Sequence, residues 1–212
     1  KSNIAVSPET AWMRGLREKS MKSRALFEEL SSNRSKPLNY YCALGIIDKY
    51  IPRDATVMNE GSDTMDIGRT VLNNYSPRSR LDAGTWGTMG VGMGQAIAAA
   101  LVNPDPGCLA VFGDSAFGFS GMEFETICRL QLPVVCIILN NNGIGAGNPT
   151  KWTNLKGQEL AGRSTLERLS YPSKSLTPSA RYEKVANAFG AIAIIETTDI
   201  RTRSELSVLI FM

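Results

Sequence analysis

The stretch VFGDSAFGFSGMEFETICRLQLPVVCIILNNNG, Val111 to Gly143, decides the fold. It holds the end of one apolar run, CLAVF, and the whole of a second run, VVCIIL, with a helix-like segment between them. Continuous apolar runs are typical of strands that are covered on both faces. Strand, helix and strand in this order predict a βαβ unit, and therefore an α/β fold with a parallel sheet flanked by helices.

Polar side chains follow both predicted strands. Asp114 comes directly after the first apolar run, and Asn141 lies among three asparagines after the second. Both strands of a βαβ unit point the same way, so these side chains are expected at the carboxyl edge of the sheet, where open α/β sheets bind ligands. A carboxylate, an amide oxygen and the Gly143 carbonyl suit Mg²⁺, and N–H groups at Ser115 and Ala116 suit phosphates. The pattern predicts a diphosphate held through Mg²⁺.

The rest of the chain predicts further elements of the same fold. Ser120 with Glu123 forms a capping-box pattern, which predicts that the helix between the two strands begins there and runs to about Leu130. A long polar surface loop is expected over residues 145–178, with one helix near 160–169. Further strands are predicted at residues 55–58 and 191–196. Further helices are predicted at residues 9–32 and 38–50, from Ser62 onward, at 180–189 and from 197 onward.

Domain organisation follows from a polar linker, SSNRSKP, that ends at Pro37. Residues 1–37 are interpreted as a linker and helix that come from an upstream region. Residues 38–212 are interpreted as one domain that is cut short at its C-terminal end. The chain is therefore expected to be a piece of a longer protein.

Composition excludes several classes of function. The sequence has 212 residues, no histidine and a net charge of +3, without a basic block, so the usual zinc sites, histidine-based triads and nucleic-acid binding are not expected. Four cysteines form no CxxC pair and are predicted to be reduced interior thiols of an intracellular protein. No apolar run is long enough to span a membrane, and no targeting signal is present.

The segment GTWGTMGVGMGQAIAAAL, Gly84 to Leu101, places five glycines before a helix-forming tail. Such a backbone is expected to approach another group closely, which is either a ligand or a tightly packed helix. A dinucleotide fingerprint fails here, because GxGxxG counted from Gly90 requires glycine where Gln95 stands.

A resemblance to a known family adds to these inferences. Gly113-Asp114-Ser115, followed by Asn141 at a spacing of 28 positions from Gly113, resembles the thiamin diphosphate motif. The segments NEGSDTMDIGRTVL and LDAGTWGTMG resemble the C-terminal cofactor domain of the 2-hydroxyacyl-CoA lyases, and oxalyl-CoA decarboxylases are close relatives. Within LDAGTWGTMG, Ala83 favours the lyases over the decarboxylases.

The resemblance implies a role for individual residues. It implies thiamin diphosphate and Mg²⁺ as cofactors, with Asp114 and Asn141 as side-chain ligands of the metal and Gly143 as a backbone ligand. For thiamin diphosphate, it implies that Ser62 and Asp63 contact the diphosphate and that the turn at Gly113, Ser115 and Ala116 surrounds it. It also implies that the Gly87 carbonyl contacts the aminopyrimidine and that Met89 is the apolar wedge that bends the cofactor. Asp63 departs from the family pattern, which has asparagine there, and Gly145 stands in place of a tyrosine.

The activity that the resemblance implies is cleavage of a 2-hydroxyacyl-CoA to formyl-CoA and an aldehyde one carbon shorter, as in fatty acid α-oxidation. The activating glutamate is expected on the pyrimidine-binding domain of a second chain, in a homodimer or homotetramer, so no catalytic acid or base is assigned and the chain alone is expected to be inactive. A peroxisomal location is implied for a eukaryotic protein, and a cytoplasmic one otherwise. The alternatives are an oxalyl-CoA decarboxylase, an acetolactate-synthase-like carboligase, or an inactive binding or assembly fragment.

Overall fold

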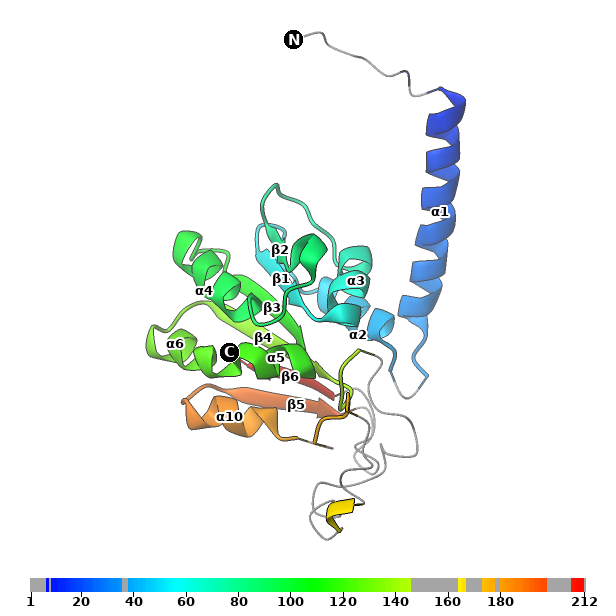
Figure 1. Ribbon diagram of the computed structural model, residues 1–212. Helices are drawn as coiled ribbons and strands as arrows, with labels where there is room; N and C mark the ends of the chain where they lie inside the picture. The colour runs from blue at the N-terminus through cyan, green and yellow to red at the C-terminus, as the bar shows by residue number, and fades with distance from the viewer. Residues whose placement is uncertain are drawn as a thin grey trace.

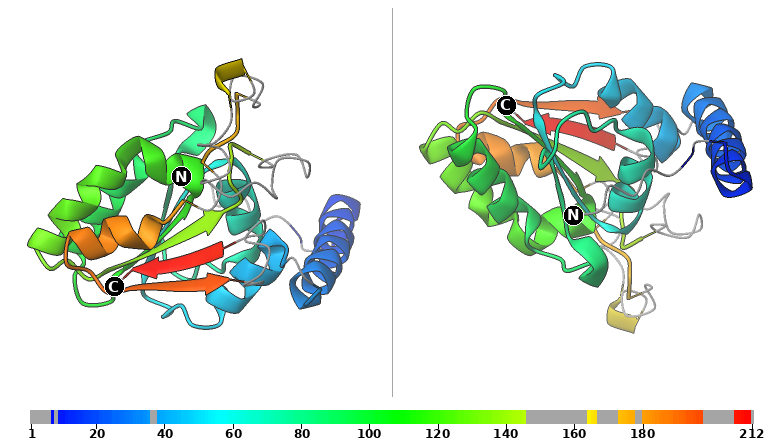
Figure 2. Two further views of the ribbon diagram at one scale, coloured as in Figure 1. Left: turned by 90° about the horizontal axis from the view of Figure 1, so that it is seen from below. Right: turned by 90° about the horizontal axis from the view of Figure 1, so that it is seen from above.

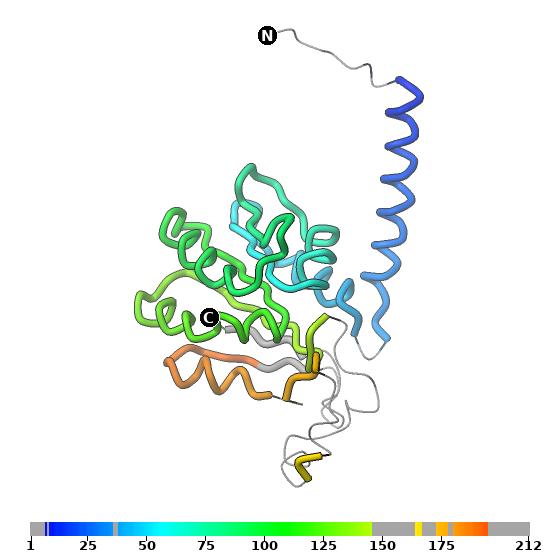
Figure 3. The backbone as a smooth tube through the Cα atoms, in the orientation of Figure 1, coloured from blue at the N-terminus to red at the C-terminus, as the bar shows by residue number. Residues whose placement is uncertain are grey.

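A computed structural model describes residues 7, 9–35, 38–145, 164–166, 173–177, 180–197 and 207–211 of the chain. It has a six-stranded sheet with helices on both faces, and one long helix that projects from this body (Figures 1 and 3). The strands are β1 (Thr56–Glu60), β2 (Arg80–Asp82), β3 (Cys108–Gly113), β4 (Val134–Asn140), β5 (Ala193–Thr197) and β6 (Ser207–Phe211). The helices are α1 (Ala11–Ser32), α2 (Tyr40–Asp48), α3 (Ser62–Val71), η1 (Gly84–Trp86), α4 (Gly92–Val102), α5 (Asp114–Ser120), η2 (Gly121–Glu123), α6 (Phe124–Arg129) and α10 (Tyr182–Ala188).

The strand order is β2-β1-β3-β4-β6-β5, and the first four of these strands are parallel. The predicted βαβ unit of β3 and β4 is therefore confirmed. β6 instead runs antiparallel to both β4 and β5. Only residues 198–206 separate β5 from β6, and a parallel return needs about a dozen residues or more, so a short connection favours the antiparallel direction. The predicted helix from 197 onward is wrong for Thr197, which ends β5, and for Ser207–Phe211, which form β6. Residues 198–206 lie outside the described chain.

The two apolar runs are buried on both faces, as predicted. Along β3, Ala110 and Phe112 pack with α4, α5 and α6, while Val111 between them packs with the group beneath α2 and α3. Along β4, Ile138 faces the first group and Ile137 the second. Figure 2 shows α4, α6 and α10 on one side of the sheet and α2 on the other. The period-two alternation of a strand thus divides each run between two cores.

The helix between β3 and β4 begins earlier than predicted. α5 starts at Asp114, directly after the strand, and Gly113 is its N-cap. The predicted capping box at Ser120 and Glu123 is wrong, because Ser120 makes no side-chain cap hydrogen bond and its hydroxyl is buried without a partner among the described residues. The helix breaks at Ser120, whose φ of −140° and ψ of 16° are not helical. Glycine follows at 121 because a Cβ there would lie 2.7 Å from the Phe117 ring. The chain therefore passes through η2 before α6 begins.

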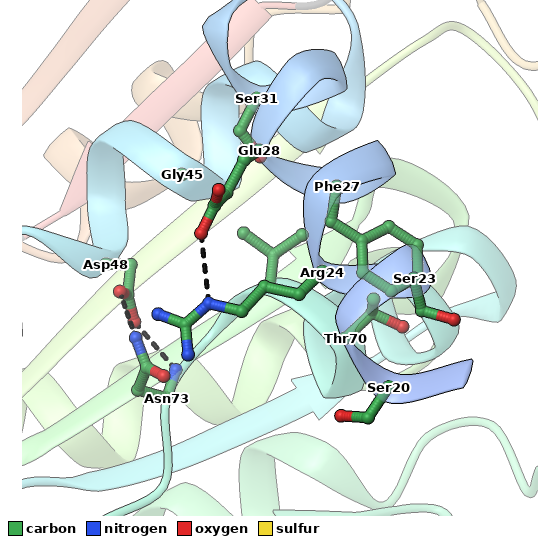
Figure 4. A pocket seen from close by; sticks show the side chains of 11 residues that line it. Ser20, Ser23, Arg24, Phe27, Glu28, Ser31, Gly45, Asp48, Thr70 and Asn73 are labelled. Carbon is green, nitrogen blue, oxygen red and sulfur yellow. Dashed lines mark hydrogen bonds and ion pairs between the residues drawn. The ribbon is translucent and has the colours of Figure 1, made fainter. Parts of the chain in front are cut away.

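Helix α1 lies apart from the sheet and has no buried residue. It packs on α2, where the rings of Phe27 and Tyr41 stack with centroids 5.9 Å apart. A cavity of about 440 Å³ lies between α1, α2 and α3 (Figure 4). Its charged side chains are already paired, because Arg24 bonds Glu28 at 3.0 Å and Asp48 accepts from Asn73 Nδ2 at 2.6 Å. None of the helices in the described ranges combines the length and the apolar character that crossing a membrane requires.

Truncation of Phe112 tests the assignment of the core. Phe112 is 0% exposed and packs edge-on against Phe117 at 6.1 Å between ring centroids. We expect Phe112→Ala to lower the free energy of unfolding by about 3–5 kcal/mol, because it leaves a cavity in the core. The matched control is Phe119→Ala, whose ring is 65% exposed, with an expected change of about 0.5 kcal/mol or less. Urea unfolding measures both, and equal losses would contradict the assignment.

Candidate functional site

The turns that follow β1, β3 and β4 meet at one edge of the sheet. In the parallel register Glu60 pairs with Phe112, and Gly113 pairs with Leu139. The residues just beyond these pairs line one cavity of about 160 Å³. The lining contains every predicted site residue except Gly87, and consists of Tyr40, Gly61, Ser62, Asp63, Thr64, Met89, Gly113, Asp114, Ser115, Ala116, Phe119, Asn141, Gly143, Ile144 and Gly145.

Gly87 lies outside the cavity lining. It follows η1 in a left-handed conformation, with φ at 59°, and is exposed. Met89, two residues later, does line the cavity. The structure therefore brings the glycine-rich loop to the site through Met89 and leaves Gly87 on the surface.

Asp114 contributes a buried carboxylate to the cavity. It is 2% exposed, and its Oδ1 accepts from Ser115 N at 2.7 Å while its Oδ2 accepts from Gly143 N at 2.9 Å. Burial raises the pKa of Asp114 to about 6, although these backbone N–H groups act against the rise. No lysine or arginine of the described residues forms an ion pair with it. An ionised Asp114 is thus a charge without a counterion, which is the property of a cation ligand.

The asparagines after β4 have different roles. Asn140 Oδ1 accepts from Asn142 N at 3.0 Å and so holds the turn. Asn141 Nδ2 donates to the Gly145 carbonyl at 2.7 Å, which fixes the orientation of the amide. Its Oδ1 is buried and has no hydrogen-bond partner among the described residues. A buried oxygen without a donor is costly unless a ligand satisfies it, so Asn141 has the free acceptor that a metal site needs.

A distant segment holds the backbone around Gly143. Ile144 N donates to the Lys174 carbonyl at 2.8 Å, and Leu176 N donates to the Asn142 carbonyl at 3.0 Å. Gly143 and Ser175 form a β-bridge between these two bonds. Residues 174–176 of the predicted loop therefore pair with residues 142–144 through backbone hydrogen bonds. Most of residues 145–178, including most of the predicted helix at 160–169, lies outside the described chain.

Two helices begin at the cavity. α3 starts at Ser62 and α5 at Asp114, and neither N-terminus has a side-chain cap. Gly61 allows their close approach: its φ is +120°, and a Cβ there would lie 3.2 Å from Gly113 N. Uncapped N–H groups at a helix start favour anions, and phosphate oxygens above all. The cavity therefore combines the carboxylate of Asp114 with free N–H groups at the start of α3, while the Ser115 N–H of α5 already donates to Asp114. This combination suits a phosphate that is bridged to a metal.

Tyr40 is a site residue that the sequence analysis missed. Its place at the start of a predicted helix gives no signal of function, because only the packing of α2 brings it to the cavity. Burial, followed by the negative charges of Asp114 and Asp63, raises the pKa of Tyr40 far above its usual range. The phenol therefore stays protonated and can donate a hydrogen bond to an anion.

The donor set fits a cation that takes few ligands from the protein. Within the described ranges no group of three or more histidine, cysteine, aspartate or glutamate side chains gathers to hold a metal. Asp114, Asn141 and the Gly143 carbonyl are neighbours in one cavity. Mg²⁺ commonly binds in this way, with phosphate oxygens and water completing its octahedron. The residues present thus fit Mg²⁺ together with a diphosphate.

Comparison with known proteins finds relatives that are 2-hydroxyacyl-CoA lyases and oxalyl-CoA decarboxylases. The chain is 51% identical to 2-hydroxyacyl-CoA lyase 1 of Homo sapiens over 189 residues, which cover 86% of this chain and 32% of that protein. It is 47% identical to the Mus musculus lyase over 205 residues, with coverages of 94% and 33%. It is 41% identical to oxalyl-CoA decarboxylase of Escherichia coli K12 over 192 residues, with coverages of 89% and 31%. The chain spans about a third of the length of these relatives.

Solved structures share the fold at lower identity. A thiamine diphosphate-dependent 4-hydroxybenzoylformate decarboxylase of Rhodococcus jostii RHA1 superposes with a TM-score of 0.57 at 22% identity, over 74% of this chain and 27% of that one. A putative thiamin diphosphate-dependent enzyme of Mycobacterium smegmatis gives 0.57 at 23% identity, over 73% and 26%. The family described as "Thiamine pyrophosphate enzyme, C-terminal TPP binding domain" matches residues 61–209. The chain therefore belongs to the C-terminal TPP-binding domain family of the thiamine pyrophosphate enzymes.

Proposed function

We propose that this domain holds the diphosphate of thiamin diphosphate through Mg²⁺. The observation that carries the proposal is the unpaired Oδ1 of Asn141, which lines the same cavity as the buried carboxylate of Asp114. These two side chains and the Gly143 carbonyl would bind the metal. When bound, thiamin diphosphate supplies a nucleophilic carbon that adds to a carbonyl group.

The remaining lining residues would hold the cofactor itself. Backbone N–H groups at Ser62 and Asp63, and at Ala116, would face the diphosphate, since they lie at the starts of α3 and α5. Ser115 would line the site through its other atoms, because its N–H donates to Asp114 Oδ1. Tyr40 would donate to the same anion. Met89 would pack as the apolar wedge, and Gly113 would leave room for the close approach of the phosphates. Gly87 would meet the aminopyrimidine only if its loop carries the carbonyl to the ring.

We propose that the longer protein is a 2-hydroxyacyl-CoA lyase, which releases formyl-CoA and an aldehyde one carbon shorter in fatty acid α-oxidation. Its support is the 51% identity to a lyase over 86% of this chain, against 41% to an oxalyl-CoA decarboxylase. The test uses the protein with its N-terminal region present. Formyl-CoA release from a 2-hydroxyacyl-CoA supports the lyase, CO₂ release from oxalyl-CoA supports the decarboxylase, and neither product supports an inactive assembly subunit.

The assembly follows from the same proposal. A glutamate on the pyrimidine-binding domain of a second chain would activate the aminopyrimidine, in a homodimer or homotetramer. Residues 1–37, which include the unburied helix α1, would connect the domain to an upstream region. The location would be the peroxisome in a eukaryote. The 212-residue chain alone would release no formyl-CoA.

Replacement of the metal ligands tests the cofactor site. Asp114→Ala should abolish Mg²⁺-dependent binding of thiamin diphosphate, and Asn141→Ala should weaken it by at least about tenfold, because each loses an oxygen ligand. Asn141→Asp keeps an oxygen ligand but loses the Nδ2 bond to the Gly145 carbonyl, so its affinity should lie between those of the wild type and Asn141→Ala. Isothermal titration calorimetry with and without Mg²⁺ measures all three. Unchanged affinity in Asp114→Ala would contradict the metal assignment.

The pKa of Asp114 predicts a pH dependence of the metal-free chain. Because burial raises this pKa from 3.8 to about 6, the folded state binds the proton more tightly than the unfolded state. Stability from this group is therefore present below about pH 4 and is lost as the pH rises through 6, by about 3 kcal/mol. The variant Asp114→Asn has no carboxyl group at this position, so it does not lose this stability as the pH rises. We therefore expect the difference in free energy of unfolding, variant minus wild type, to increase by about 3 kcal/mol between pH 4 and pH 8.

Urea unfolding without divalent cations, at several pH values, measures this difference. A fixed offset is expected as well, because an amide accepts only one of the two N–H bonds that Asp114 accepts. The change of the difference with pH is therefore the informative quantity. A difference that stays constant from pH 4 to pH 8 would mean that Asp114 titrates normally.

Asp63 places a carboxylate in the cavity where a diphosphate is proposed. Like charges at short range repel, so Asp63→Asn should bind thiamin diphosphate about threefold to tenfold more tightly at low ionic strength. The matched control is Asp66→Asn, on the exposed side of the same helix, which should leave the affinity unchanged. Calorimetry at two salt concentrations measures both. Equal affinities of wild type and Asp63→Asn would show that Asp63 points away from the diphosphate.

A further inference from the structure

The buried carboxylate of Glu60 joins two segments that line the cavity. Glu60 ends β1 and is 0% exposed. Its Oε1 accepts from the N–H of Gly90, and its Oε2 accepts from the N–H of Gly92 at 2.5 Å. The residue after it, Gly61, starts the turn that leads to Ser62. One side chain thus ties the glycine-rich loop to the turn between β1 and α3.

The hydrogen-bond partners of the Glu60 carboxylate are backbone N–H groups. Within the described residues no lysine or arginine forms an ion pair with Glu60. Burial raises the pKa of Glu60, and the bonds from Gly90 and Gly92 act against the rise. Gly92 also begins α4, whose N-terminus is the positive end of the helix dipole. One carboxylate oxygen therefore holds the start of this helix, and the other holds the loop that precedes it.

The glycines of the loop are explained by this contact. A Cβ on Gly92 would lie 2.3 Å from Glu60 Oε2 and 2.8 Å from Met58 Sδ. Gly90 has a φ of +85°, which side-chain-bearing residues rarely adopt. The carboxylate beneath the loop thus requires glycine at 92, and the turn requires it at 90. The alternative that the sequence left open, tight packing against another part of the protein, applies to Gly92, whereas Gly90 is required by its backbone conformation.

We propose that Glu60 is a positioning residue of the cofactor site, which sets Met89 opposite Ser62 and Asp63 across the cavity. Met89 directly precedes one of the two bonded amides, and all three residues line the same cavity. Glu60 itself is absent from that lining and acts through the loop. This proposal rests on the proposed function in one respect, which is that thiamin diphosphate is taken as the ligand. The affinity for that ligand is expected to depend on the position of the loop.

The variant Glu60→Gln tests this role in the full 212-residue chain. A glutamine can accept one of the two bonds and turns its NH₂ group toward the other N–H. We expect the amides of Gly90 and Gly92 to exchange hydrogen at least about tenfold faster, while amides in β3 keep their wild-type rates. We also expect the affinity for thiamin diphosphate with Mg²⁺ to fall at least about tenfold, measured by calorimetry.

The matched control is Glu183→Gln, which makes the same change at another buried carboxylate, on α10 and 5% exposed. It should leave loop exchange and cofactor affinity unchanged. If Glu60→Gln does not fold, Glu60→Asp replaces it, because a shorter carboxylate reaches at most one of the two amides, and the same rise in exchange is expected.

Three outcomes would overturn the proposal: unchanged exchange in the loop, an equal rise throughout β3, or a loosened loop with unchanged affinity. Exchange is measured without cofactor, so it tests the hold of Glu60 on the loop whether or not the wild type binds thiamin diphosphate. A wild-type chain that binds no thiamin diphosphate while Glu60→Gln still loosens the loop would instead overturn the proposed function.

Discussion

The parallel pairing of β1, β3 and β4 is the constraint on which the candidate site depends. It brings three strand ends to one edge, so that residues 61–63, 113–116 and 141–145, far apart in the chain, share a single cavity. A shift of one residue in either pairing would exchange the two faces of a strand, and would move Phe112 and Val111 into each other's core. Two separate apolar cores therefore hold the register, and the register holds the site.

The electrostatics of this edge are unbalanced in the chain alone. Asp114 and Glu60 are both buried, burial raises the pKa of both, and neither has a basic partner in the described part of the chain. Each oxygen of both carboxylates accepts one backbone N–H, so their hydrogen bonds alone do not separate the two residues. Their positions differ, because Asp114 lines the cavity beside the unpaired Oδ1 of Asn141, whereas Glu60 is absent from that lining. Two residues of the same charge at the same edge are therefore told apart by which of them faces the cavity.

Much of this arrangement could be predicted from the sequence, because apolar runs and their spacing determine βαβ units. The motif residues Asp114 and Asn141 were expected at one edge, and they line one cavity. The capping-box pattern at Ser120 misled because the pattern is local, whereas the helix start is set by the strand that ends at Gly113. Tyr40 could not be found, since its contribution depends on how α2 packs. Glu60 lay beyond the predicted strand at residues 55–58, and only the structure extends β1 to it and shows its partners.

The pairing of residues 142–144 with 174–176 has a consequence for how the protein could vary. Both ends of the intervening segment are hydrogen-bonded to each other beside the proposed metal ligands. Insertions or deletions between these ends would therefore leave the geometry of Gly143 and its neighbours unchanged, at little cost in loop-closure entropy. The segment can thus diverge in sequence and length while the edge that holds the proposed metal ligands stays the same.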